Sequence, residues 1–176
     1  SSFLAPGNTT YKAKAGRDRQ QHFIDDLGPD AIVLNVGSGT DDYGPRVINL
    51  EIGPFQNVDV VGRSEWLPIG DRCVNAVITT GVLEHVGDLE ASLAEIDRVL
   101  LPGGQVFHEV PFVQGFHGTF DYRRFTNQGA RARVKNYELI DEVKDAMAGL
   151  LETIEKNIVI GTAEVRQLFP LSKVDM

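Results

Sequence analysis

The sequence predicts an α/β protein organised around a mostly parallel sheet, and two observations support this class. Predicted strands at Val74–Thr80 and Gln105–Val110 flank a segment with apolar residues at helical spacing, Leu89–Leu101, in the strand–helix–strand order of a βαβ unit. Earlier in the chain, the largely apolar run Ile32–Val36 stops at Gly37–Gly39. That pattern is typical of a buried parallel strand that ends in a tight turn.

The composition excludes several classes of protein. With 176 residues, 42% hydrophobic and 24% charged, the chain suits one globular domain, residues 1–176. A net charge of −8 argues against a general nucleic-acid binder, because phosphate contacts need clustered Lys and Arg. The lone Cys73 excludes an internal disulfide and fits a reducing compartment, so we expect a cytoplasmic protein. No apolar run approaches about 18 residues, so we expect no membrane span.

The first half of the chain is predicted to start with a helix over Tyr11–Leu27, followed by a strand over Ala31–Val36. Only ten residues, Gly37–Arg46, lead to the next strand, Val47–Glu51. A parallel crossover usually needs a dozen or more residues, so we expect a shortened crossover without a helix; an antiparallel hairpin is the alternative. Val58–Val61 is expected as a short third strand.

The segment after the strand at residues 74–80 is predicted to form a helical turn, Gly81–Val86, and then a capped helix. Asp88 is a good N-cap for the helix Leu89–Leu101. Pro102–Gly104 should end that helix and turn the chain into the strand Gln105–Val110.

A loop and the C-terminal third complete the prediction. Pro111–Phe125 contains five aromatic residues, and a loop of this length is usually functional. Thr126 can cap a short basic helix that runs to Lys135. The stripe from Leu139 to Ile154 fits a helix, although Tyr137–Ile140 fits a sixth strand equally well. Asn157–Thr162 is expected as the last strand.

Two features point to a nucleoside-shaped ligand at the carboxyl end of the sheet. Glycines at Gly37 and Gly39 let backbone N–H groups approach a ligand that a Cβ would keep away. Glu51, fourteen residues after Gly37, ends the next strand, and its carboxylate can accept hydrogen bonds from a ribose diol. A plain structural turn and a solvated strand-end acid are the alternatives.

Several further motifs stand in a characteristic order over residues 31–126. They are Val33-Leu34-Asn35-Val36-Gly37-Ser38-Gly39-Thr40, Ile48-Asn49-Leu50-Glu51, Leu67-Pro68, Val82-Leu83-Glu84-His85-Val86, Arg98-Val99-Leu100-Leu101-Pro102-Gly103-Gly104 and residues 117–126, HGTFDYRRFT. Together they resemble the class I S-adenosylmethionine-dependent methyltransferases, of the small family often called methyltransferase type 11.

The resemblance implies a Rossmann-like three-layer sandwich with about seven strands, the last of them antiparallel. It also implies S-adenosyl-L-methionine as the cofactor and S-adenosyl-L-homocysteine as the product. The positions that would contact the cofactor are Gly37, Ser38, Gly39, Glu51, Ile52, Arg63, Ser64, Gly81 and Val82.

The acceptor side is predicted from residue chemistry. A neutral imidazole can take a proton from an amine or hydroxyl, so His85 and His117 are candidate catalytic bases, with Tyr122 beside them. Arg123 and Arg124 would favour an anionic acceptor; surface ion pairing is their alternative role. The spacing of histidines and acids predicts no metal site.

Three positions differ from the family's usual pattern: Arg63, Asn75 and Asn35 stand where an acid is common. A non-catalytic relative that keeps the fold as a binding module is therefore the alternative to a methyltransferase acting on a small molecule, with a homodimer left open. A nicotinamide-dependent oxidoreductase is disfavoured, because Asp42 stands where the dinucleotide fingerprint needs Gly or Ala.

Overall fold

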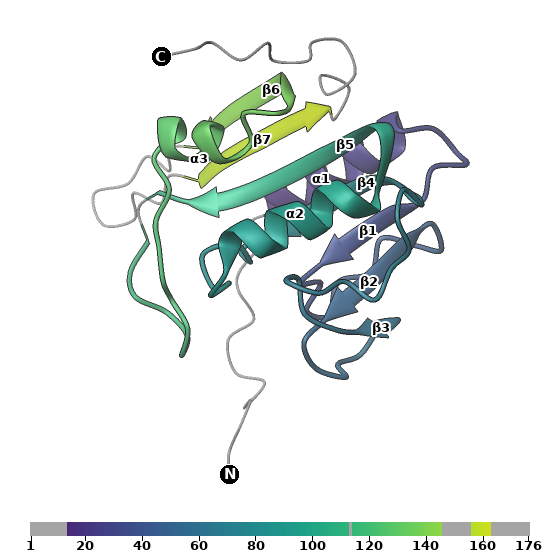
Figure 1. Ribbon diagram of the computed structural model, residues 1–176, viewed down its shortest axis with the longest axis horizontal. Helices are drawn as coiled ribbons and strands as arrows, with labels where there is room; N and C mark the ends of the chain where they lie inside the picture. Colours follow the sequence, from purple (N-terminus) through teal and green to yellow (C-terminus); the bar gives the residue numbers. More distant parts are fainter. Residues whose placement is uncertain (1–13, 113, 146–155, 163–176) are drawn as a thin grey trace, which may run out of the picture.

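A seven-stranded sheet with strand order β3-β2-β1-β4-β5-β7-β6 forms the centre of the molecule (Figure 1). The computed structural model describes residues 14–112, 114–145 and 156–162. The elements within them are α1 (Lys14–Asp26), β1 (Val33–Val36), β2 (Val47–Glu51), β3 (Val60–Val61), β4 (Val74–Thr80), α2 (Leu89–Val99), β5 (Leu100–Pro111), α3 (Asn127–Arg133), β6 (Glu138–Asp145) and β7 (Lys156–Thr162).

Five neighbouring strands, β3 to β5 in sheet order, run parallel, so the predicted α/β class is confirmed. β7 pairs antiparallel with both β5 and β6. Of the two alternatives for the segment after Tyr137, the strand is correct and the helix is wrong over 138–145. The remainder of the predicted helical stripe, 146–155, lies outside the described residues. Pairing with β7 satisfies the backbone of β6, and a side-chain pattern alone cannot reveal that pairing.

The link between β1 and β2 is a parallel crossover without a helix, as predicted, and the hairpin alternative is wrong. Val33 is in register with Val47, and Val36 with Leu50. Side-chain amides fasten the short link: Asn49 Nδ2 donates to the carbonyl of Asp41 at 3.0 Å. These bonds take over the role that helix packing has in longer crossovers.

Helices cover both faces of the sheet. On one face, Phe23 and Ile24 of α1 pack against a cluster that includes Phe107 of β5. On the other face, Ile96 and Val99 of α2 pack against residues of β1, β2, β4 and β5. Burying each such large apolar side chain favours folding by roughly 1.5–3 kcal/mol before the entropy cost. Figure 1 shows α1 behind the sheet and α2 in front of it.

Local signals set the ends of the helices, with one exception. Asp88 Oδ1 accepts from the backbone N–H of Ala91 at 3.0 Å, which confirms the predicted N-cap. Thr126 caps α3 in the same way, through Gly129. The predicted end of α2 at Leu101 is wrong: the helix ends at Val99, because Leu100 already pairs with Val74 as the first residue of β5.

Candidate functional site

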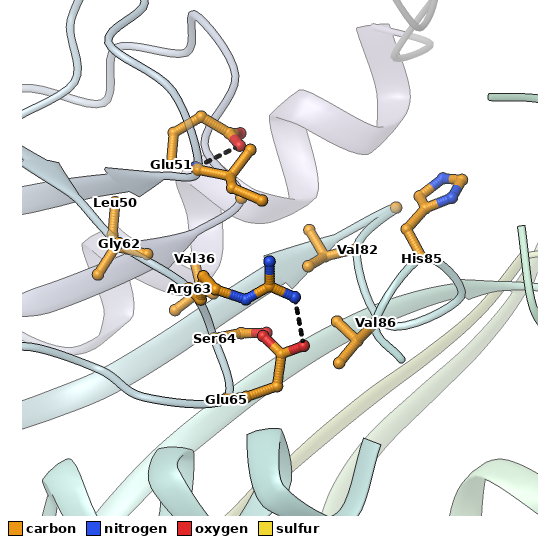
Figure 2. Close-up of a pocket in the computed structure, with 13 residues that line it drawn as sticks. Val36, Leu50, Glu51, Gly62, Arg63, Ser64, Glu65, Val82, His85 and Val86 are labelled. Atoms are coloured by element: carbon orange, nitrogen blue, oxygen red, sulfur yellow. Dashed lines mark hydrogen bonds and ion pairs between the residues drawn. The ribbon is translucent and has the colours of Figure 1, made fainter. Parts of the chain in front are cut away.

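A cavity of about 240 Å³ opens where β1, β2 and β4 end. Figure 2 shows the side chains around it. The lining residues are Val36, Gly37, Leu50, Glu51, Ile52, Gly62, Arg63, Ser64, Glu65, Gly81, Val82, His85 and Val86. Of the predicted cofactor residues, Ser38 and Gly39 are outside this lining. Topology explains the convergence, because the carboxyl ends of parallel strands meet at one edge of the sheet.

Glu51 is held at the cavity by the backbone of two neighbouring turns. Its Oε2 accepts from the N–H of Gly39 at 2.9 Å, and its Oε1 accepts from the N–H of Ile52 at 2.7 Å. Ser38 is buried beneath the same turn, where its N–H donates to the carbonyl of Leu50 at 3.1 Å. The carboxylate is therefore fixed in one orientation before any ligand arrives.

Gly37 occupies a position that no other residue fits. Its φ is +69°, in the region that L side chains rarely adopt. A Cβ added there would lie 2.2 Å from Cγ2 of Val82, the residue that follows β4 in the cavity wall. The glycine therefore lets the β1 and β4 ends approach each other.

Figure 2 shows an ion pair on one wall of the cavity, between Arg63 and Glu65. The guanidinium Nη2 donates to Glu65 Oε1 at 3.0 Å, and the Glu65 side chain is only 14% exposed. A tight turn, in which the N–H of Trp66 donates to the carbonyl of Arg63 at 3.1 Å, returns Glu65 to the cavity. Sequence reasoning missed Glu65; the nearby opposite charge on Arg63 was the available signal.

Asn35 and Asn75 are the other two positions that differ from the family's usual pattern. Their side-chain amides form hydrogen bonds within the fold. Asn35 Nδ2 donates to Asn49 Oδ1 at 3.1 Å between β1 and β2. Asn75 Oδ1 accepts from the N–H of Ile32 at 2.9 Å. Neither Asn35 nor Asn75 is among the described residues that line the cavity.

His85 and His117 come together beside the cavity, around a buried acid. Their ring centroids are 4.7 Å apart, with the planes at 81°. Glu84, with a side chain 1% exposed, places Oε1 3.8 Å from His85 Nε2 and 4.0 Å from His117 Nε2. The three residues line a small hollow of about 30 Å³ that shares Gly81 and His85 with the larger cavity. Glu84 was not among the predicted site residues.

The described part of the loop after β5, residues 114–125, is fastened to the turn after β4. Arg123 donates to the carbonyls of Leu83 and Gly87, each at 3.2 Å, and also to the carbonyl of Val86. The N–H of Tyr122 donates to the carbonyl of Glu84 at 2.9 Å. These bonds hold His117 beside His85.

A second arginine organises the loop internally. Arg124 donates to both carboxylate oxygens of Asp121 and to the carbonyls of Gln114 and Gly115. The Arg124 hydrogen bonds hold the pKa of the Asp121 carboxyl far below its usual range. Tyr122 is exposed and stacks on Phe120, with ring centroids 6.2 Å apart. Tyr122, Arg123 and Arg124 lie outside the lining of the cavity, and their contact with an acceptor stays a prediction.

Among the described residues there is no helix with the length and apolar character needed to cross a bilayer.

Comparison with a family model identifies part of the chain. Residues 42–108 match a model described as a methyltransferase domain. This stretch includes Glu51, Arg63 and the Glu84-His85 pair, but it begins after the Gly37–Gly39 turn.

Solved structures share the fold at low sequence identity. The Burkholderia thailandensis 1,6-didemethyltoxoflavin-N1-methyltransferase, solved with bound 1,6-didemethyltoxoflavin and S-adenosylhomocysteine, is 18% identical, with a TM-score of 0.66 over 92% of each chain. The [4+2]-cyclase SpnF is 15% identical, with a TM-score of 0.68 over 86% of this chain and 83% of that one. A possible histamine N-methyltransferase from Thermotoga maritima is 18% identical, with a TM-score of 0.60 over 82% and 87%. At these identities the likeness concerns the fold.

Several curated proteins also match part of the chain. Translation initiation factor IF-2 of Carboxydothermus hydrogenoformans is 60% identical over 38 residues, which is 22% of this chain and 5% of the factor. The Caldicellulosiruptor saccharolyticus factor is 53% identical over 129 residues, 70% of this chain and 14% of the factor. The chain thus spans a small fraction of the length of the curated relatives that it matches.

Proposed function

We propose that this chain is a class I S-adenosylmethionine-dependent methyltransferase that transfers a methyl group to a small-molecule acceptor by in-line displacement at the sulfonium carbon. The match of residues 42–108 to a methyltransferase domain and the fold shared with solved methyltransferases support the proposal. The observation that carries the proposal is the prearranged Glu51 carboxylate in the cavity at the carboxyl end of the sheet.

The residues around Glu51 fit the ribose of the cofactor. Each carboxylate oxygen accepts one backbone N–H, and each retains a lone pair for a ribose hydroxyl. Because the carboxylate is already oriented, little side-chain entropy is lost when it binds the diol. Gly37, Gly81 and Val82 line the part of the cavity that would receive the methionine portion, next to the ends of β1 and β4.

The other wall of the cavity suits the adenine. Ile52 is 57% exposed at its edge and offers an apolar surface for the ring. Arg63 cannot accept a hydrogen bond from the adenine amino group, but the Glu65 carboxylate beside it can. Ser64 lines the same wall. We therefore assign to Glu65 the accepting role that the sequence leaves vacant at Arg63.

The cofactor supplies the activated methyl group and the leaving group. What remains for the chain is to orient the acceptor, exclude water and take a proton from it. His85 stands on the cavity wall, and its Nδ1 bonds to the carbonyl of Phe120. A carbonyl can only accept, so the proton lies on Nδ1 and the lone pair lies on Nε2. We assign the general-base role to His85 Nε2, with His117 as its neighbour.

Charge and enclosure favour a small acceptor. The net charge of −8 disfavours a polyanionic substrate, and Gln114 and His117 of the loop enclose the small hollow beside the cavity. We place the reaction in a reducing, cytoplasmic compartment. The alternative is a binding module without catalysis, which the Arg63–Glu65 ion pair on the cavity wall favours.

Calorimetric titration separates these two functions. A methyltransferase should bind S-adenosylmethionine and S-adenosylhomocysteine with one-to-one stoichiometry. Absence of heat up to millimolar cofactor would contradict the methyltransferase proposal and favour the module. Mass spectrometry of small molecules that copurify with the protein would then narrow the acceptor class.

A further inference from the structure

We propose that Glu84, His85 and His117 form a binding site for a divalent transition-metal ion. One ligand atom from each residue, a carboxylate oxygen and two imidazole nitrogens, lies within 4.8 Å of the other two. The site stands on this geometry and does not require the proposed methyl transfer. A bound ion would occupy the lone pair of His85 Nε2, so metal binding and the general-base role are alternative uses of that atom.

The distances leave room for an ion between the three side chains. Glu84 Oε1 is 3.8 Å from His85 Nε2 and 4.0 Å from His117 Nε2. Metal–ligand bonds of about 2.0–2.2 Å place neighbouring ligands about 3.0–3.5 Å apart in tetrahedral or octahedral sites. Glu84 therefore needs to approach each imidazole by about 1 Å or less, and the two imidazole nitrogens, which lie within 4.8 Å of each other, need to approach by at most about 2 Å. Rotations of the two partly exposed imidazoles can supply these shifts.

Hydrogen bonds on the far side of each ring present the correct nitrogen to the ion. His85 Nδ1 bonds to the carbonyl of Phe120. His117 Nδ1 lies 3.1 Å from the carbonyl of Gly115 and 3.5 Å from Asp121 Oδ2. Both partners are acceptors, so Nδ1 carries the proton in each ring and Nε2 has its lone pair toward Glu84. Metal-binding histidines are usually held by such outer contacts.

Asp121 is fixed in its charged state by Arg124. The guanidinium donates to both oxygens of a carboxylate whose side chain is 1% exposed. The N–H of His117 donates to the same carboxylate at 2.9 Å. Asp121 thus holds both the backbone and the ring of one proposed ligand.

The donor set indicates the class of metal. Two imidazoles and one carboxylate suit zinc, cobalt or iron(II), whereas magnesium and calcium prefer oxygen ligands. The hollow of about 30 Å³ beside the three residues is large enough for an ion and a bound water. Since His85 and Gly81 also line the larger cavity, the open coordination position would face the acceptor side.

Cobalt(II) titration of the metal-free protein tests the site. We expect one ion per chain, visible absorption bands of nitrogen–oxygen coordination, and displacement of the bands by Zn²⁺. His85→Asn and His117→Asn should each weaken cobalt binding by at least about tenfold, since a ligand is lost. Asp121→Asn should weaken cobalt binding by about 10- to 100-fold, because Asp121 holds His117 in place. His22→Asn, at an exposed position on α1, is the matched control and should bind as the wild type does.

Far-ultraviolet circular dichroism should show that each variant is folded. Glu84→Gln removes a buried acid, so the two half-exposed histidines keep the test decisive if that variant unfolds. No one-to-one cobalt binding by the wild type would overturn the proposal. Binding unchanged in both folded histidine variants, or lost in His22→Asn, would overturn it as well.

Discussion

The N–H of Gly39 donates a 2.9 Å hydrogen bond to the carboxylate of Glu51, and this bond joins the turn after β1 to the end of β2. Neighbouring parallel strands place these residues side by side, with Val36 in register with Leu50. The positive φ of Gly39 turns the backbone so that its N–H points at the carboxylate. The geometry of the candidate site begins with this contact.

Glu51→Ala should weaken S-adenosylmethionine binding by about tenfold or more, on the order of 1.4 kcal/mol, because the acceptor for the ribose hydroxyls is lost. Calorimetry measures the change. Glu138→Ala, at an exposed position on β6, is the control and should leave affinity as in the wild type. Equal affinity in the two variants would mean that the ribose does not lie at Glu51.

Gly37→Ala should destabilise the protein more than Gly39→Ala does. Both glycines have positive φ, so both variants carry backbone strain of about 1–2 kcal/mol. Only at Gly37 would the Cβ clash with Val82, at 2.2 Å; in the part of the chain that the structure describes, no atom lies within 4 Å of a Cβ at Gly39. The clash should lower the free energy of unfolding of Gly37→Ala by a further amount of about 1–3 kcal/mol, which urea unfolding measures.

Adding Val82→Ala to Gly37→Ala removes the two methyl groups in conflict. Part of the lost stability should therefore return in the double variant. If the double variant is no more stable than Gly37→Ala, the clash is not the cause of the destabilisation.

His108 should make stability depend on pH between about 6.5 and 4. Burial lowers its pKa from 6.5 to about 4 in the folded state. The unfolded chain therefore takes up a proton first as the pH falls. The stabilising contribution is complete above pH 6.5 and is lost progressively toward pH 4, roughly 3 kcal/mol in all.

Urea unfolding at several pH values checks this dependence. His108→Asn, which has no titrating ring, should show a slope between pH 6.5 and 4 that is shallower than the wild-type slope. His22→Asn, on the exposed face of α1, should retain the wild-type slope. Parallel curves for the wild type and His108→Asn would contradict the lowered pKa.

Arg123→Lys should loosen the loop at residues 111–125. A single ammonium cannot reproduce the planar fork that bonds to the carbonyls of Leu83, Val86 and Gly87. Amide hydrogen exchange in the loop should become faster by about tenfold or more, equivalent to about 1.4 kcal/mol of local stability. Arg72→Lys, in the exposed turn before β4, is the control and should leave exchange in the loop unchanged.

Local sequence patterns were sufficient to predict most of the helices and strands. The sequence predicts β2 and β4 with the bounds that the structure has, because each is a run rich in apolar and β-branched residues between turn residues. The Asp88 and Thr126 caps follow from chemistry within one helical turn. The end of α2 and the nature of β6 depended on distant partners, Val74 and β7, which no local pattern contains.

The candidate site likewise contains residues that the sequence brings together and residues that only the tertiary structure brings together. By itself, the sequence determined that Gly37, Glu51 and Gly81 meet, because residues after parallel strands always share one edge of the sheet. Only the tertiary structure decided that Glu65 returns to Arg63 and that His117 reaches Glu84 and His85. These contacts depend on the paths of loops. A loop's path follows from many individual hydrogen bonds, such as those of Arg123 and Arg124. Such bonds leave no periodic pattern in the sequence, so they cannot be predicted from it.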